Sequence, residues 1–478
     1  MVPMGVERMM FRTHKRKLAA LGAACLLAAT AASPGPLPAR ALAVPNTTAS
    51  TIAGTSATTG PDAAAESAAG ELHALTLFMG TDKGYDLYRG TTRAEGAVML
   101  VRLLGLKSDA ATGTAHPFTD VPAWASGSVS LLWQKGLTTG VSADRYGAAE
   151  PLSGRQYCTF LLRALQRADG AAAYRDAVAT ARTLRLIDAN SLVLADPDAP
   201  VRRADLVVMS RNALAATVGS GSRTLLDNLV VARRVPADAA GRWLAARLAP
   251  SILGAAAGGY DQVRLLHDWL VNRNQYGWLP VSDDPNRTLS GEAYAALSLG
   301  TGVCGAYSRA MQYLCDVAGV PCAVVQGQAS GTSGWTGHAW NQVRIDGAWY
   351  HLDVTFDDPI GTQTLRYNYF NVTDTDLARD HAWDRAAWPA CTATAANWFV
   401  RNGSVVSSVS ELEESLLAVV GRRGTELTVR AVPFSPGYSD ATIRGILVDT
   451  GVVSGYTQSL DPVMGVIRVS KLTYFPDA

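Results

Sequence analysis

Two stretches decide the fold of this chain: residues 300–322, GTGVCGAYSRAMQYLCDVAGVPC, and residues 337–359, GHAWNQVRIDGAWYHLDVTFDDP. In the first stretch, apolar residues recur at helical spacing after Cys304, which predicts a helix with this thiol at or beside its N-terminus. The unpaired N–H groups at the start of a helix favour a thiolate over a thiol. Cys304 is therefore the candidate nucleophile, and such a nucleophile needs a proton-transfer partner.

The second stretch predicts a β-hairpin that supplies this partner. Asp346-Gly347 is a two-residue turn signal, and if the strands pair directly across it, the numbers of facing residues add up to 693. His338 then faces Thr355, and Asp353 is its diagonal neighbour on the same face, within side-chain reach. We therefore expect Asp353 to orient His338, with the predicted helix packed beside the hairpin. The two predicted strands are residues 337–345 and 348–356.

The alternation of side chains divides this hairpin into a polar and a largely apolar face. The apolar face can pack on a core while the polar face holds a site. His351 lies on the polar face two residues before Asp353, so it is a rival candidate for the base, or else a surface or supporting group. The polar face carries His338, Trp340, Gln342, Arg344, Trp349, His351, Asp353 and Thr355, and the apolar face carries Ala339, Val343, Ile345, Tyr350, Leu352 and Val354.

The chain resembles the transglutaminase-like superfamily in three ordered motifs: GVCGAY around Cys304, the hairpin stretch, and YFNV at 369–372 with His381 beyond. The resemblance extends from Tyr260 to about Trp383. It implies a papain-like α+β core with a catalytic triad. The nucleophile, the general base and acid, and the orienting group are implied to be Cys304, His338 and Asp353, in that order.

Further candidates lie around this triad. Tyr294 stands where bacterial members of the superfamily often carry a tyrosine, and Trp340 could shield the catalytic pair from water. Only the backbone N–H of Cys304 can be assigned to an oxyanion site. No C-x-x-C pair and no H-E-x-x-H motif occurs, so no metal or other cofactor is expected.

Residues 1–43 have the three parts of a secretory signal: a basic segment, an apolar run at 18–32, and Ala41-Leu42-Ala43 as a cleavage site. The alternative is a short membrane anchor, but the run is brief for a span. After removal of the signal, no segment is expected to span a membrane. Residues 44–70, which are rich in Ala, Thr, Ser, Gly and Pro, are predicted to be a flexible spacer.

Charge and cysteine content limit the function classes. The whole chain carries a formal charge of +1 and residues 1–43 carry +5, so the rest carries −4, which argues against a nucleic-acid binder.

The odd number of cysteines after the signal leaves at least one thiol unpaired. Cys315 and Cys322 could pair or could pack as apolar groups. The five cysteines are Cys158, Cys304, Cys315, Cys322 and Cys391.

Residues 71–220 contain three similar helix openings, TTRAE, LSGRQ and VRRAD, at steps of 61 and 49 residues. With the FTDV motif before the second opening, they resemble S-layer homology domains, which implies a three-unit helical array that binds cell-wall polysaccharide in its grooves. The second opening carries Gly154 in place of the motif arginine. The alternative is a helical domain that only packs against its neighbour. The residues implied for binding are Arg93, Asp120, Trp124 and Arg203.

The chain is thus predicted to be multidomain: repeats at 71–220, the catalytic core at 221–400, and a small α/β unit of unknown role at 401–478. In the last unit, an acidic helix at 410–419 precedes strand-like runs. These runs are residues 426–432, 443–448 and 465–469.

Together these features predict a secreted, cell-wall-associated cysteine enzyme that opens amide or peptide bonds through a thioester. Water would resolve the thioester in a peptidase or amidase, and an amine would resolve it in a cross-linking enzyme. We slightly favour hydrolysis, with a peptide, a protein or a cell-wall peptide as substrate. A hypothesis of a different class is a catalytically silent surface or scaffold protein that retains the triad for packing.

Overall fold

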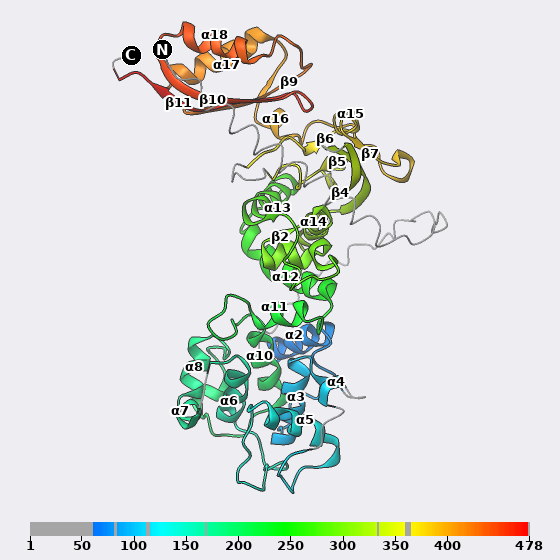
Figure 1. The fold of residues 1–478 in the computed structure, drawn as a ribbon, viewed down its shortest axis with the longest axis vertical. Helices are drawn as coiled ribbons and strands as arrows, with labels where there is room; N and C mark the ends of the chain where they lie inside the picture. Colours follow the sequence, from blue (N-terminus) through cyan, green and yellow to red (C-terminus); the bar gives the residue numbers. More distant parts are fainter. Residues whose placement is uncertain are drawn as a thin grey trace. The chain divides into compact units, whose positions relative to one another are not determined.

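The computed structural model describes two units, which within the described residues are 61–243 and 244–476 (Figure 1). The predicted signal and residues 44–60 of the predicted spacer lie outside the described residues. Among those that are described, no helix combines the length and the apolar character that a membrane span requires. The described ranges are 61–80, 84–110, 115–167, 170–331, 334–358 and 365–476.

The first unit is helical, and the three helix openings that the sequence aligns lie side by side in it. Their backbones form a closed ring: Thr91 N donates to Val201 O (3.1 Å), Leu152 N to Thr91 O (2.8 Å), and Val201 N to Leu152 O (2.9 Å). Thr92 and Ser153 then cap the first two helices. The helices are α2 (Pro61–Ala74), α3 (Arg93–Leu103), α4 (Lys107–Ala110), α5 (Ala123–Gln134), α6 (Gly154–Ala164), α7 (Gly170–Arg175), α8 (Ala177–Thr183), α9 (Leu192–Ala195), α10 (Arg203–Ala213), α11 (Leu225–Val231) and α12 (Ala237–Leu253), which extends into the second unit.

Residues 61–70 correct the prediction of a flexible spacer, because they form most of helix α2. Ala65, Ala68 and Ala69 are buried, and α2 packs on α10. Glu71 anchors the helix by accepting hydrogen bonds from Arg211 Nη1 (3.3 Å) and Trp243 Nε1 (2.7 Å). The composition argument failed because alanine has the highest helix propensity and allows close packing of helices.

The second unit contains two mixed groups of helices and strands, so the predicted mixed α/β character is confirmed. A five-stranded antiparallel sheet has the order β6-β5-β4-β3-β7, and a four-stranded sheet has the order β10-β11-β9-β8. The helices that follow α12 are α13 (Gly259–Arg273), η1 (Leu289–Gly291), η2 (Ala295–Leu299), α14 (Cys304–Ala318), α15 (Asp374–Leu377), η3 (Arg385–Ala387), α16 (Trp398–Arg401), α17 (Val409–Gly421) and α18 (Asp440–Asp449), and the strands are β1 (Gln275–Tyr276), β2 (Thr301–Gly302), β3 (Cys322–Gly331), β4 (Gly334–Ile345), β5 (Ala348–Leu352), β6 (Phe370–Val372), β7 (His381–Ala382), β8 (Val405–Val406), β9 (Glu426–Ala431), β10 (Val453–Asp461) and β11 (Val466–Tyr474).

The predicted hairpin register is confirmed. Ile345 pairs with Ala348 and Gln342 with His351, so facing numbers add up to 693 as expected. Both turn residues, Asp346 and Gly347, have positive φ, as a two-residue hairpin turn requires. The second strand is shorter than predicted, because β5 ends at Leu352 and the chain turns at once.

Helix α14 and strand β4 are joined by packing and by one buried side chain. Cys304 is the first residue of α14, as predicted, and the helix packs on β3, β4 and α13. Asn341 of β4 is fully buried and donates to Ser308 O of α14 (2.9 Å) and to Ala323 O of β3 (3.2 Å). The start of the helix is therefore fixed against the strand that carries His338.

The C-terminal part of this unit places α17 and α18 on one face of the four-stranded sheet (Figure 1). The strand predicted at 443–448 is wrong, because these residues belong to helix α18, which Ser439 caps. Ile443 and Leu447 are buried at helical spacing while Val448 is 64% exposed. The β-branched residues suggested a strand, but tertiary packing of a helical face prevails over this weak propensity.

We predict that Gly327→Ala destabilises the five-stranded sheet. Gly327 pairs with His338, and a Cβ atom here would lie 2.3 Å from Ala382 O and 2.8 Å from Trp340 Cη2. Relieving this overlap should lower the free energy of unfolding by about 1–3 kcal/mol in urea titrations. Gly331→Ala on the same strand is the control, because its nearest neighbour atom would be 4.0 Å away. Equal stability of the two variants would contradict the tight packing at Gly327.

Candidate active site

The thiol of Cys304 lies at the N-terminus of α14. The preceding residue, Val303, has an extended backbone, and the Cys304 side chain begins the helix with only 6% of the residue exposed. Gly302 permits this tight entry, because a Cβ atom at Gly302 would lie 2.5 Å from Ala306 Cβ. The helix start therefore presents its thiol from a closely packed turn, where the helix dipole favours a thiolate.

His338 and Asp353 form the predicted pair. His338 Nε2 lies 2.7 Å from Asp353 Oδ2, and the two side chains are 2% and 0% exposed. Asp353 Oδ1 accepts hydrogen bonds from Thr355 N (2.9 Å) and Phe356 N (3.1 Å). Burial opposes ionisation, but the interactions with His338 and His381 outweigh it and hold the pKa of Asp353 well below its ordinary value. An ionised carboxylate therefore fixes the ring of His338 through Nε2, so Nδ1 would be the nitrogen that exchanges a proton with a thiol.

The local geometry differs from the predicted diagonal strand pair. Asp353 is the first residue beyond β5, and its backbone N donates to Tyr369 O (3.1 Å). The carboxylate caps the following turn while it binds His338. The predicted neighbours thus meet, although Asp353 belongs to a turn rather than to a strand.

His381 is a member of the site to which sequence reasoning gave no role. Its Nε2 lies 3.1 Å from Asp353 Oδ2 and its Nδ1 lies 2.6 Å from Asp380 Oδ1. Strand β7 places it there by pairing with β3 at Ala329. The motif that includes His381 was visible in the sequence, but the edge-strand pairing of β7 was not, so nothing indicated that His381 returns to Asp353.

His351 is not a surface group and does not have the contacts of a base. It is fully buried, its Nδ1 accepts the indole N–H of Trp340 (3.1 Å), and its Nε2 lies 2.8 Å from Asp374 Oδ1. Burial lowers the pKa of His351 to about 4 against the opposing effect of Asp374. Both nitrogens of a neutral ring are therefore engaged, and the role of His351 is to hold Trp340. The Trp340 ring in turn stacks 6.0 Å from the His338 ring.

Two aspartates that follow Asp353 attach the loop after β5 to helices α13 and α14. Asp357 is fully buried, accepts Tyr369 N (3.0 Å), and lies 3.2 Å from His267 Nε2 of α13. Asp358 accepts the hydroxyl of Tyr307 of α14 (2.5 Å). Burial raises the pKa of each of these two aspartates to about 6. They thus bind side chains of the two neighbouring helices, α13 and α14.

The remaining candidates of this unit are Tyr294 and the other cysteines, of which Cys322 is half-buried and the rest are buried. Tyr294 is 0% exposed and directly precedes the π-helix η2. None of the five cysteines in the described part of the chain forms a disulfide. Cys322 interacts with Cys315 and Asn341, and burial raises its pKa well above the ordinary value. Burial also raises the pKa of Cys391 to about 12, so this thiol is poorly suited to attack.

The predicted polymer-binding residues of the first unit differ in accessibility. Arg93 and Arg203 are 5% and 7% exposed, and their Nε atoms donate to Tyr146 O (3.0 Å) and Tyr85 O (3.1 Å), respectively. The carboxylate of Asp120 accepts the backbone N–H groups of residues 146–148 and so holds that loop. Trp124 is 61% exposed. Of the four, Trp124 offers the accessible contact surface.

Two groups of side chains bring potential metal-ligand atoms within 4.8 Å of one another in the described residues. In each group, hydrogen bonds account for the short distances, since protons lie between the histidine nitrogens and the carboxylates. In the second group, the Trp340 N–H also fixes His351 with a proton on Nε2, where a metal would need a lone pair. We assign neither group to a metal. The groups are His338, Asp353 and His381, and His351, Asp374 and Cys391.

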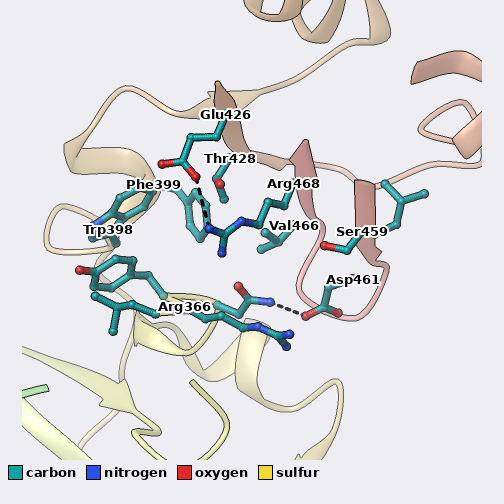
Figure 2. Close-up of a pocket in the computed structure, with 13 residues that line it drawn as sticks. Arg366, Trp398, Phe399, Glu426, Thr428, Ser459, Asp461, Val466 and Arg468 are labelled. Carbon is teal, nitrogen blue, oxygen red and sulfur yellow. Dashed lines mark hydrogen bonds and ion pairs between the residues drawn. The ribbon is translucent and has the colours of Figure 1, made fainter. Parts of the chain in front are cut away.

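A cavity of about 220 Å³ lies between residues 365–368, α16 and strands β9 to β11 (Figure 2). Two pairs of polar side chains that line the cavity are hydrogen-bonded: Asn368 donates to Asp461 (2.7 Å), and Arg468 donates to Glu426 (3.4 Å). None of the triad residues lines this cavity. It is therefore a feature of the junction with the C-terminal sheet and not of the reaction site.

Comparisons with known proteins agree with this site. A family model described as the Transglutaminase-like superfamily matches residues 246–354. The kyphoscoliosis peptidases of Mus musculus and Homo sapiens are each 26% identical over 156 residues, which cover 30% of this chain and 23% of theirs. A crystal structure of a "TGase" is 21% identical over 27% of this chain and 34% of its own, with a TM-score of 0.21. The chain thus spans under a quarter of the length of these curated relatives, and its similarity to the transglutaminase-like superfamily is shown for residues 246–354.

We predict that His267 makes stability fall as the pH rises from 6.5 to 9. Burial opposes protonation of His267, but Asp268 and Asp357 outweigh it and raise its pKa to about 9. A raised histidine pKa stabilises the fold fully below the unfolded value near 6.5, and this contribution is lost as the pH rises through about 9. Urea unfolding followed by tryptophan fluorescence should show a loss of up to about 3 kcal/mol over this range.

His267→Gln should abolish the part of this pH dependence that His267 contributes, while His381, whose pKa is also raised, keeps its own part. His351→Gln is the matched control, because His351 is equally buried and bonded to a carboxylate but has a lowered pKa and stays neutral in this range. The control should retain the fall in stability between pH 6.5 and 9. A wild-type protein with constant stability over this range would contradict the assignment.

Proposed function

We propose that this chain is a cysteine enzyme that cleaves or transfers amide bonds through a thioester on Cys304. The observation that carries the proposal is the buried 2.7 Å contact between His338 and an ionised Asp353. His338 lies on strand β4, which packs against the helix that begins at Cys304. A thiol at a helix start and an oriented imidazole are the two parts that nucleophilic acyl transfer needs. The transglutaminase-like match to residues 246–354 is consistent with this chemistry.

The proposed reaction follows from the roles of these groups. The sulfur of Cys304 attacks the carbonyl carbon of the amide, and the thiol proton passes to His338. The negative oxygen of the tetrahedral intermediate would be stabilised by the backbone N–H of Cys304 at the positive end of α14. When the C–N bond breaks, His338 returns the proton to the departing amine and a thioester remains. Asp353 stabilises the imidazolium throughout and keeps its ring oriented.

Either of two acceptors completes the cycle. Water, deprotonated by His338, would release a carboxylate, whereas an amine would give a new amide. We favour hydrolysis slightly, and the curated relatives named as peptidases support this preference. The proposed substrates are peptides, proteins or cell-wall peptides.

We also propose that the chain is exported and associates with the cell wall through its first unit. The basic and apolar N-terminal sequence supports export, and the closed ring of the three helix openings supports the S-layer homology-like arrangement. In this arrangement, Arg93 and Arg203 would shape the grooves from within, because they are buried. Trp124 would contact the polysaccharide.

We predict that Cys304→Ala abolishes amide turnover while the protein stays folded. Incubation with peptide and cell-wall fragments, followed by mass spectrometry, distinguishes cleaved from amine-linked products. Asp353→Asn should reduce the rate by roughly a hundredfold to ten-thousandfold, because the imidazole loses its orientation and its counter-charge. Cys391→Ala is the control, since burial raises the pKa of its thiol and both nitrogens of the nearby His351 are engaged by Trp340 and Asp374. If a thiol probe leaves wild-type Cys304 unmodified, the protein is a catalytically silent surface protein instead.

We predict that Trp124→Ala weakens binding of the protein to purified cell-wall polysaccharide about tenfold or more, because an exposed indole supplies a large contact area on sugars. The measurement is cosedimentation of the chain from residue 44 onward. Trp133→Ala on the same helix, α5, is the matched control, because Trp133 is also exposed but lies outside the motif. Equal loss in both variants, or no binding by the wild type, would leave only the packing role for this unit.

A further inference from the structure

A continuous line of buried hydrogen bonds runs from the catalytic pair into the protein. It starts at His338 Nε2 and Asp353 Oδ2 (2.7 Å) and continues from Asp353 Oδ2 to His381 Nε2 (3.1 Å). From His381 Nδ1 it reaches Asp380 Oδ1 (2.6 Å), and the other oxygen of Asp380 accepts the hydroxyl of Tyr369 (2.6 Å). Thus two histidines, not one, bind the carboxylate that orients the catalytic base.

The position of His381 between two carboxylates determines its protonation state. A neutral imidazole has one N–H, so one of its two nitrogens would present a lone pair to a carboxylate oxygen. Contacts of 2.6 and 3.1 Å on both sides therefore require two N–H groups or a protonated carboxyl. Asp353 is ionised in this environment, and the interactions with Asp353 and Asp380 outweigh burial and raise the pKa of His381. An imidazolium at His381 would satisfy both contacts, and the ring is fully buried beside the catalytic pair.

The carboxylate of Asp353 is saturated by this arrangement. Its two oxygens accept four hydrogen bonds, which is about the capacity of a carboxylate. Two come from the backbone of Thr355 and Phe356 and two from the histidines His338 and His381. Because the two histidines share one oxygen, the negative charge of Asp353 is divided between two imidazole rings.

We propose that His381 is a positioning residue: a permanently protonated imidazolium that shares Asp353 with His338 and sets the pH range over which His338 holds its proton. This inference rests on the proposed function, since it assigns His338 as the base. The ring centroids of the two histidines are 5.4 Å apart. At this separation a fixed positive charge disfavours a second one, and it weakens the attraction of Asp353 for the His338 proton.

Two carboxylates, the ring of His338 and three aromatic side chains face His381. Asp353 and Asp380 favour its protonation, and His338 disfavours it when charged. The ring of Tyr369 lies 5.7 Å away, and its hydroxyl binds Asp380. Trp340 and Phe356 pack against the imidazole without charge. His351 lies beyond Trp340 and is neutral, because its pKa is lowered.

The first test observes the histidines directly in the full chain with Cys304→Ala, in which no thiol titrates with His338. Side-chain NMR of selectively labelled histidine should show two ring N–H groups on His381 up to at least pH 8. His381→Gln in the same background removes the charge but keeps an amide donor. It should move the titration midpoint of His338 upward by about one pH unit or more.

The second test follows the rate at which iodoacetamide alkylates Cys304 as a function of pH in the wild type and in His381→Gln. The upper limit of the pH range of the thiolate–imidazolium pair should move to higher pH in the variant. His116→Gln, which removes a histidine of the first unit, should leave the midpoints of the profile in place.

The outcomes separate this inference from the proposed function. An unreactive Cys304 in the wild type would overturn the enzyme proposal, whatever the NMR shows. A reactive Cys304 together with a His381 that has a single ring N–H at pH 7, or with an unchanged His338 midpoint in His381→Gln, would overturn the role of His381 alone. If His381→Gln does not fold, the NMR of the Cys304→Ala protein still decides the protonation state of His381.

Discussion

The buried carboxylate of Asp353 is the constraint on which the site depends. An ion without solvent costs several kcal/mol unless hydrogen bonds replace the lost water. Here four donors do so, and they come from three separate places: strand β4, the turn after β5, and strand β7. Strand β5 must end at Leu352, because only a turn can direct two successive backbone N–H groups at one side chain. The same carboxylate therefore shapes the local backbone and orients the base.

This constraint extends to the helices through the next two aspartates. Asp357 is held by His267 of α13, and Asp358 by Tyr307 of α14, so the loop after β5 is attached to both helices that pack beside the sheet. Because Tyr307 follows Cys304 by three residues, one turn of α14 carries both the thiol of Cys304 and an anchor of the loop. The relative positions of thiol and imidazole are thus fixed by buried polar contacts as well as by apolar packing. Asn341 adds a third such contact between β4 and α14.

The sequence predicted those parts of the site that depend on local periodicity. The helix start at Cys304, the two-residue turn and the register that brings His338 near Asp353 all follow from spacing alone. Burial and distant pairing do not follow from spacing. His351 shares its strand face with polar residues, yet Trp340 and Trp383 cover it, and His381 reaches Asp353 only because β7 adds to the edge of β3.

The same limit applies to the first unit. Motif spacing aligned the three helix openings but did not show that Arg93 and Arg203 would be buried against the tyrosine carbonyls of a neighbouring segment. The acceptors, Tyr146 and Tyr85, are 61 residues apart, which is also the step between the first two openings. At the equivalent position of the second opening, a Cβ on Gly154 would lie 2.5 Å from Val193 Cγ1. Val193 therefore packs where the other two openings have an arginine side chain. The second opening thus differs from them in its packing as well as in the missing charge.

Three buried histidines of the second unit show how one rule sets their charge. Each has a carboxylate on one ring nitrogen, so the partner of the other nitrogen decides. His267 and His381 face a second carboxylate and have raised pKa values, whereas His351 faces the N–H of Trp340 and has a lowered one. A second carboxylate thus favours the cationic form of the first two rings, and the Trp340 N–H favours the neutral form of the third. His338 differs from all three, because its carboxylate partner is shared with a cation and the element packed against its strand carries a thiol. The surroundings of these rings therefore support the proposal that His338 is the one that exchanges a proton with the thiol.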